Sequence, residues 1–465
     1  MLELTIVIVY FIAMVLIGIT TRRDATDTRN FFILGQKGST LYITGSLFAT
    51  IVGASATLGM AGLGYSRGLT GGWWVFSGCI GLVILGFFFA RKVREYGLFT
   101  LPELAGKQYN EWVRLAVSVL IPVAWLGVIG GQIIAAGKIM SVLGMGTPEM
   151  WMVISTAVFV LYCLLGGQWA AVKTDLYQGI IISVGLIGGL IAIFAKTGGI
   201  GQFWAKLPQG FTSFPVSDKF STYDLVKTLL LVGLTYVVGP DMYSRVFSAK
   251  DGATARRSVF WTAGLLVPLT LAVVLTGMVA AVLFPGIASE QAFPTVIKSA
   301  MTPAVAGLVL AALLCAVMSS ANTCLLSAST IMTRDIIQKL RPGLTDGQVL
   351  FISRTGIVVL GALSLCIALY LKGIISSLMF AYTIYTAGVI PLVIAGFWRE
   401  RLKVTPLAAL AALVGGGGTA LASQIMKIKY LDLGALGVSV VLLFLVSAIE
   451  NWAHANAGQT AERTK

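Results

Sequence analysis

Residues 41–64 read LYITGSLFATIVGASATLGMAGLG. The stretch is long and apolar enough to cross a bilayer, which takes about 20 residues. Glycines interrupt its middle, with Ser and Thr between them. Because glycine tolerates conformations outside the helix, unwinding at such a stretch costs little. We therefore expect a membrane helix that is broken halfway, where free backbone carbonyls can face a cation.

A second interrupted stretch lies at residues 229–245, where Gly233, Gly239 and Pro240 break an apolar run. Proline removes a backbone donor and clashes with the preceding turn. A pair of broken spans at matching places in two halves of a chain points to a binding site near the bilayer midplane. For either stretch alone, ordinary packing of small residues between helices is the alternative interpretation.

The composition extends this picture to the whole chain. Of 465 residues, 57% are hydrophobic and only 11% are charged, whereas a soluble domain carries about 25% charged residues. We therefore predict an all-α membrane protein with about 13 transmembrane helices. The expected spans are 2–20, 41–64, 71–92, 113–141, 149–168, 173–196, 223–247, 257–284, 302–333, 347–371, 374–398, 404–424 and 431–450.

The charges predict the orientation. Most of the 33 Lys and Arg residues fall in alternate loops, which the positive-inside rule assigns to the cytoplasm. This places the N-terminus outside and the C-terminus inside, in the plasma (inner) membrane. The net charge of +14 does not indicate nucleic acid, because no soluble basic domain is present to bind it.

Enzymatic chemistry is not expected. The single histidine, His454, lies in the C-terminal tail, and the five cysteines lie in apolar blocks without the spacing of metal ligands. No phosphate-binding loop is present. The only metal ion that the sequence leads us to expect is sodium.

A polar stripe interrupts the apolar span at residues 315–324, CAVMSSANTC. Positions 316, 319, 320 and 323 share one helix face. Hydroxyl and carbonyl oxygens suit a hard cation such as sodium, as they suit harder divalent ions. The alternative is that these residues act as polar contacts between helices.

Three charged residues remain to be explained. Asp175, within GGQWAAVKTDLYQ at 166–178, is a functional candidate because ionisable residues in membrane spans usually are. Alternatively it is a helix-start carboxylate, paired with Lys173. Asp241 and Arg245 have the spacing to pair across one helical turn, and we expect a structural or inner-gate ion pair there.

At residues 46–54, 59–65, 166–178 and 316–320 the sequence resembles the sodium:solute symporter family, which includes proline, pantothenate, sialic acid and sugar symporters. The resemblance implies a leucine-transporter-like 5+5 inverted repeat with one extra N-terminal and two extra C-terminal helices. The implied parts are 1–40 (extra N-terminal helix and inner loop), 41–196 (first five-helix repeat), 197–222 (outer loop), 223–398 (second, inverted repeat) and 399–465 (two C-terminal helices and a short inner tail).

The same resemblance implies a principal sodium site. Its ligands would be the carbonyls of Ala49, Val52 and Ala316 and the hydroxyls of Ser319 and Ser320. Some members hold a second sodium, which here would involve Asp175, Ser319, Asn322 and Thr323. Asn322 stands where the family has a serine.

The solute pocket is expected around Ile51, Ser55, Ala56, Gln132 and Tyr236. Proline symporters have an aspartate in place of Ile51. The pocket offers few partners for a hexose, whose unpaired hydroxyls would cost about 1–3 kcal/mol each. We therefore expect sodium-coupled import of an amino acid such as proline, or of a small organic acid. The alternatives are proton coupling through Asp175, and a passive channel or membrane receptor without coupling. The sequence sets no oligomeric state.

Overall fold

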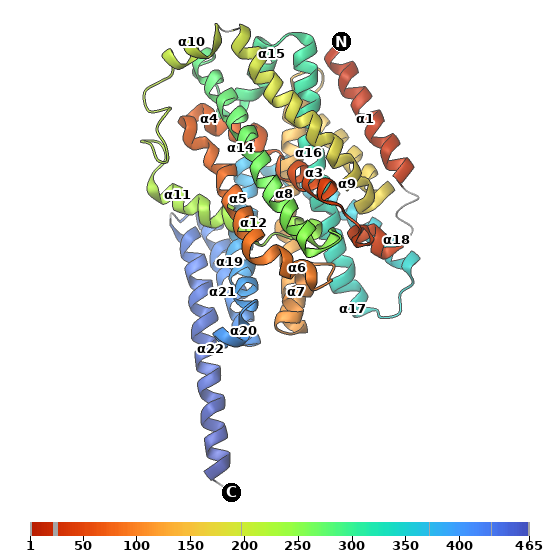
Figure 1. Cartoon of the computed structure of the whole chain (residues 1–465), viewed down its shortest axis with the longest axis vertical. Coiled ribbons are helices and arrows are strands. Elements are labelled where there is room, and N and C mark those ends of the chain that lie inside the picture. The colour runs from red at the N-terminus through yellow and green to blue at the C-terminus, as the bar shows by residue number, and fades with distance from the viewer. Residues whose placement is uncertain (1, 22–26, 197, 372, 429, 464–465) are drawn as a thin grey trace.

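The computed structural model describes residues 2–21, 27–196, 198–371, 373–428 and 430–463. In these ranges the regular secondary structure is helical, apart from two isolated β-bridges. Figure 1 shows the helices as one bundle, with the two chain ends at opposite ends of it and α22 (Leu431–Arg463) extending beyond the rest. The expected all-α class is therefore confirmed.

Twelve of the α-helices have the following bounds: α1 (Leu2–Thr21), α2 (Thr28–Ile33), α5 (Trp73–Ile84), α6 (Ala90–Glu95), α7 (Leu101–Gln108), α10 (Gly199–Ala205), α14 (Gly252–Leu283), α15 (Ala292–Ala300), α17 (Gln338–Leu340), α18 (Asp346–Leu371), α20 (Arg399–Leu402) and α21 (Pro406–Met426). In the described part of the chain, ten helices are long and apolar enough to cross a membrane, and three shorter apolar helices accompany them. Each of the 13 expected spans contains helix, and the number that cross the membrane stays a prediction.

The break in residues 41–64 is present. α3 (Thr40–Ile51) ends at Val52, whose φ of −79° and ψ of 67° leave the helical range. The N–H of Gly53 then bonds to the carbonyl of Ile51 at 2.9 Å instead of continuing the helical pattern. The chain resumes as a π-helical turn at Ser55–Gly59, followed by α4 (Met60–Arg67). Such wide turns are common at functional sites.

The second break lies where proline and glycine predict it. α11 (Thr222–Thr228) continues through a π-helical turn into α12 (Leu234–Val237), and the helix stops at Val238. α13 (Pro240–Ser248) begins with Pro240 in its first position. There the missing N–H of proline would have had no helical partner in any case.

A kink joins two expected spans into α9 (Pro148–Lys196). Gly167 takes a φ of 54°, and a Cβ at this position would lie closer than 3.0 Å to the ring of Phe31. Both the positive φ and the close approach therefore require glycine. The kink places Asp175 well inside the second half of α9, away from any helix start.

The centre of the bundle is α16 (Pro303–Ile331), which packs on α1, α3, α8 (Glu111–Ser141) and α9. The most apolar stretch of α16 is 83% buried inside the protein, whereas the most apolar stretch of α22 is only 28% buried. The whole stripe from 315 to 324 is buried. Polar side chains on this helix therefore face other helices and not lipid.

Candidate functional site

The two broken helices meet at a cavity inside the bundle. Residues of α3, α8, α12, α13, α16 and α19 (Ile374–Gly396) contribute to its wall. The cavity is lined by Thr50, Ile51, Gly53, Ser55, Trp125, Val128, Gln132, Thr235, Tyr236, Gly239, Asp241, Met242, Ser320, Cys324, Leu378 and Tyr382. Four of the five expected pocket residues are therefore on the wall, and the fifth, Ala56, is buried beside it.

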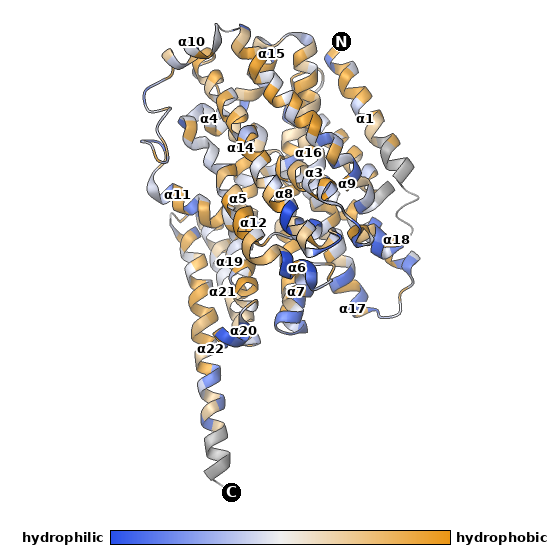
Figure 2. Cartoon of the chain, in the orientation of Figure 1, coloured by the Kyte–Doolittle hydropathy of each residue, from blue (hydrophilic) through white to orange (hydrophobic). Residues whose placement is uncertain are grey.

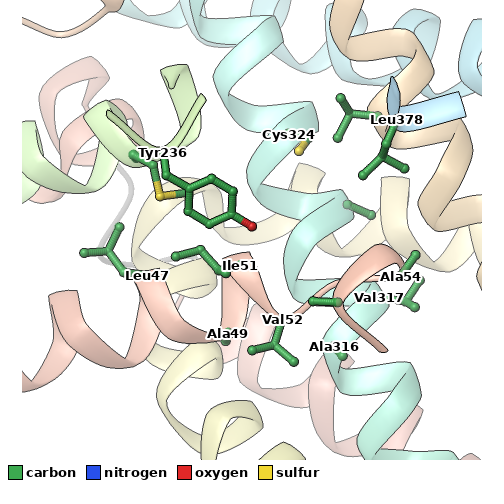
Figure 3. Close-up of a cluster of buried hydrophobic side chains, with 14 of the residues drawn as sticks. Leu47, Ala49, Ile51, Val52, Ala54, Tyr236, Ala316, Val317, Cys324 and Leu378 are labelled. Carbon is green, nitrogen blue, oxygen red and sulfur yellow. The ribbon is translucent and has the colours of Figure 1, made fainter. Parts of the chain in front are cut away.

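The residues expected to bind sodium lie where the end of α3 meets α16. Ala49, Val52 and Ala316 are fully buried, and Figure 3 draws all three where the two helices approach each other. The hydroxyl of Ser320 donates to the carbonyl of Thr50 at 2.5 Å. This bond joins the broken end of α3 to the polar stripe of α16.

The two serine hydroxyls already have partners for their hydrogens. Ser320 donates to Thr50, and Ser319 donates to Asp175 Oδ1 at 2.5 Å. A hydroxyl oxygen that donates its hydrogen still has lone pairs to offer. Both oxygens therefore remain able to accept a cation.

Gly53 lies between the expected sodium site and the cavity, where the backbone approaches side chains of both. A Cβ at this position would lie closer than 3.0 Å to both Ser320 Oγ and Gln132 Oε1. The side-chain oxygen of Gln132 in turn accepts the N–H of Ala54 at 2.8 Å, which satisfies a backbone group freed by the break. Only glycine allows the backbone to approach both side chains.

Asp175 forms a buried ion pair with Arg245. The guanidinium Nη2 lies 3.3 Å from Asp175 Oδ2, and both side chains are almost completely buried. Ser46 accepts a hydrogen bond from Arg245 Nε at 2.7 Å and donates to Asp175. Arg245 also donates to Thr323. A single network thus connects α3, α9, α13 and α16.

This network corrects one expectation. We predicted that Arg245 pairs with Asp241, and that prediction was wrong, because the guanidinium extends across the bundle to Asp175. Sequence reasoning also missed Ser46 as part of the network. Its signals were a polar side chain in the apolar stretch 41–64 and its place at the start of the family-like segment 46–54.

The set expected for a second sodium is only partly brought together. Ser319 contacts Asp175 and Thr323 contacts Arg245. Asn322 faces another direction, since Cys163 Sγ of α9 lies 3.2 Å from Asn322 Oδ1. In the described chain no hydrogen bond joins Asn322 to Asp175.

Much of the cavity wall was not predicted, including Trp125, Asp241 and Tyr382. The indole N–H of Trp125 donates to Asp241 Oδ1 at 2.6 Å, and Tyr382 lies on the same wall. The sequence signal was an aspartate directly after the break at Pro240, which we interpreted as part of an ion pair.

The broken helices, their central cavity and the oxygen-lined junction define the class of ion-coupled membrane transporters built on interrupted helices. The sequence model of the sodium:solute symporter family matches residues 31–416. The chain belongs to this family. Sodium-coupled symport of a small solute is its class of activity, Na⁺ is its coupling ion, and it is an integral membrane protein.

Among curated relatives, the chain is 25% identical to the sodium/glucose cotransporter of Vibrio parahaemolyticus, over 92% of this chain and 86% of that protein. It is 24% identical to the high-affinity proline transporter PutP of Bacillus subtilis, over 94% and 96%. It is 27% identical to the sodium/pantothenate symporter of Escherichia coli, over 92% and 91%.

Two solved structures show the fold. A Na⁺-coupled sialic acid symporter in a substrate-bound outward-open state superposes with a TM-score of 0.82 at 18% identity, covering 97% of this chain and 98% of that one. A nucleobase-cation-symport-1 family transporter in a closed conformation gives 0.64 at 14% identity, covering 91% and 95%. The expected leucine-transporter-like fold is confirmed, whereas the division into two repeats remains a prediction.

Proposed function

We propose that the protein imports a small solute together with sodium by alternating access. Sodium would bind the carbonyls of Ala49, Val52 and Ala316 and the hydroxyls of Ser319 and Ser320. The observation that carries this proposal is the contact between Ser320 and the broken end of α3. It brings neutral oxygens of two helices together, in the chemistry that a hard cation prefers.

The same geometry supports a coupling mechanism. Ser320 belongs to the proposed ion site and also lines the cavity. A sodium ion between α3 and α16 would hold the two helices together and fix that wall for the solute. Closure of the outer side and opening of the inner side would then release both.

The proposed solute is a small amino acid such as proline, or a small organic acid, within a pocket that includes Ile51, Ser55, Gln132 and Tyr236, with Ala56 beside it. Relatives are named for glucose, proline and pantothenate. Ile51 offers no hydrogen-bonding side chain, so this part of the wall supports an apolar portion of the solute, such as the ring of proline, better than it supports a hydroxyl of a hexose.

A second sodium at Asp175, Ser319, Asn322 and Thr323 also remains a proposal. In the described geometry the guanidinium of Arg245 already supplies a positive charge to Asp175. A second sodium would therefore have to displace Arg245. Tracer fluxes of sodium and solute test this proposal, since a ratio of one sodium ion per solute would contradict it.

The proposed orientation has the N-terminus outside and the C-terminus in the cytoplasm, in the plasma (inner) membrane. Figure 2 shows hydrophilic residues gathered on α6, α7, α17 and α20, towards the end of the bundle from which α22 projects. Short basic segments mark the cytoplasmic side of membrane proteins. We assign the chain no catalytic reaction, and its named relatives are transporters.

The test is thermal unfolding of the purified protein in sodium and in potassium at equal ionic strength. A ligand that binds only the folded state stabilises it by mass action. We expect sodium to stabilise the wild type. Ser320→Ala should lower the sodium affinity about tenfold, which corresponds to about 1.4 kcal/mol of binding free energy.

Ser327→Ala is the matched control. Ser327 is buried on the same helix, and its hydroxyl has no hydrogen-bond partner in the described residues, so its loss should leave sodium affinity unchanged. Equal unfolding of the wild type in both salts, with uptake driven by a pH gradient, would favour proton coupling through Asp175. Conductance without coupled uptake would indicate a channel.

A further inference from the structure

We propose that the solute carries a positively charged nitrogen, as a protonated amine or a quaternary ammonium, and that Asp241 binds it. The inference rests on the proposed function and narrows its solute class. It assigns a role in recognition to a carboxylate that belongs neither to the proposed sodium site nor to the Asp175 network.

Asp241 is placed to meet a solute. It lies in the first turn of α13, directly after the break, and lines the cavity. The indole of Trp125 fixes Oδ1 through a bond of 2.6 Å, while among the described residues Oδ2 has only the weak thiol donor of Cys324 at 3.7 Å. A carboxylate has about four acceptor positions, so most of them remain available to a ligand.

The charge of Asp241 is not balanced by the protein. Among the described side chains Asp241 forms no ion pair, and Arg245, one helical turn further, is bound to Asp175. The described wall of the cavity holds no Lys, Arg or His. The N-terminus of α13 offsets part of the negative charge but supplies no counterion. Because a charge inside a membrane protein is costly without a partner, the missing cation is expected from the ligand.

The rest of the wall suits a cationic nitrogen. Trp125, Tyr236 and Tyr382 line the same cavity, and aromatic faces attract ammonium groups, including quaternary ones. Trp74 stacks on Tyr382, with ring centroids 6.4 Å apart and an interplanar angle of 21°, which holds that ring in place.

The same charges disfavour other solutes. A simple organic acid would bring a second negative charge next to Asp241, with no basic residue on the described wall to offset it. A sugar would leave the charge of Asp241 unbalanced. An amine satisfies the carboxylate, and a zwitterion can direct its own carboxylate towards the bound sodium.

The test uses pairs of probes that differ only in the cationic nitrogen. L-Proline is compared with tetrahydrofuran-2-carboxylate, in which oxygen replaces the ring nitrogen. Choline is compared with 3,3-dimethyl-1-butanol, its uncharged carbon analogue, and glucose serves as a neutral polyol. Thermal stabilisation of the full chain is measured with each probe in saturating sodium, for the wild type, Asp241→Asn and Asp241→Glu.

We expect a nitrogen-bearing probe to stabilise the protein, and its analogue without the cationic nitrogen to bind about tenfold more weakly or worse. Asp241→Asn should remove this preference, and Asp241→Glu should restore part of it. Stabilisation by sodium alone should persist in Asp241→Asn, which also shows that the variant is folded.

Several outcomes would overturn the inference: equal binding of each nitrogen-bearing probe and its analogue, binding of glucose in preference to both nitrogen-bearing probes, no binding of either of them, or an unchanged preference in Asp241→Asn. Loss of the sodium-only stabilisation in a folded Asp241→Asn protein would make this carboxylate a sodium ligand instead. Failure of the proposed function looks different, because the wild type would then show no response to sodium.

Discussion

Asp175 and Asp241 are two carboxylates inside one helical bundle, and they have opposite surroundings. Asp175 is enclosed by Ser46, Ser319 and Arg245. Asp241 is held by one indole and otherwise faces a cavity. Arg245 lies four residues after Asp241, yet it pairs with the more distant aspartate. The difference teaches that the carboxylate without a counterion is open to a ligand, whereas the paired one would first have to release Arg245.

The ion pair of Asp175 and Arg245 also suggests different roles for the two aspartates, one in stability and one in ligand recognition. A buried ion pair contributes little net stability, but removing one partner leaves an uncompensated buried charge. Asp175 and Arg245 are therefore constrained by each other. Asp241 is held by the indole of Trp125 and has no ion-pair partner among the described side chains, so its replacement should change binding more than folding.

The largest expected effect comes from removing one partner of the Asp175–Arg245 ion pair. Arg245→Met should destabilise the protein by about 3–5 kcal/mol, because Asp175 would lose its counterion. The double variant Arg245→Met, Asp175→Asn should recover most of this loss. Thermal unfolding in detergent measures both, and Asp241→Asn is the contrast, with little change expected. An Arg245→Met protein as stable as the wild type would contradict the importance of the pair.

A smaller effect is expected at Gly53, which lies between the expected sodium site and the cavity. Gly53→Ala would place a methyl group against Ser320 and Gln132, and overpacking of this kind costs about 1–3 kcal/mol. We expect lower stability together with loss of the sodium response in thermal unfolding. Gly264→Ala in α14 is the control, because nothing lies within 4 Å of a Cβ at that position. Equal behaviour of the two variants would show that the close approach at Gly53 is not required.

The smallest effect concerns an ion pair near water. Lys138 and Glu290 pair at the far end of the bundle from the basic helices, with their side chains 26% and 28% exposed. Glu290→Gln should cost no more than about 1 kcal/mol, because solvent screens partly exposed pairs. The measurement is thermal unfolding at low and high salt. If Glu290→Gln lost as much stability as Arg245→Met, burial could not explain why the two ion pairs differ in their contribution to stability.

The sequence predicted those features that depend on local chemistry. Glycine in 41–64 and Pro240 in the second stretch mark the two breaks, because these residues act on the backbone where they stand. The helical period placed Ser319 and Ser320 on one face of α16, and both are buried in the junction with α3 and α9. The class of fold and the location of the cavity followed from these signals.

Long-range pairing could not be predicted in the same way. Whether Arg245 reaches Asp241 or Asp175 depends on how α13 is rotated against α9, which no single segment encodes. Asn322 shows the same limit, since it lies off the stripe of 316, 319, 320 and 323 and faces Cys163. The bond between Trp125 and Asp241 joins residues 116 positions apart.

The ion pair of Asp175 and Arg245 also has an electrical consequence. Moving one elementary charge across the membrane is worth about 2.3 kcal/mol per 100 mV. A neutral pair that moves as a unit carries no net charge through this field, so the potential neither drives nor opposes its rearrangement. Among the described side chains Asp241 has no such partner, so under the proposed alternating access the empty protein would return with this negative charge. The voltage dependence of that return step is therefore expected to arise at one carboxylate of α13.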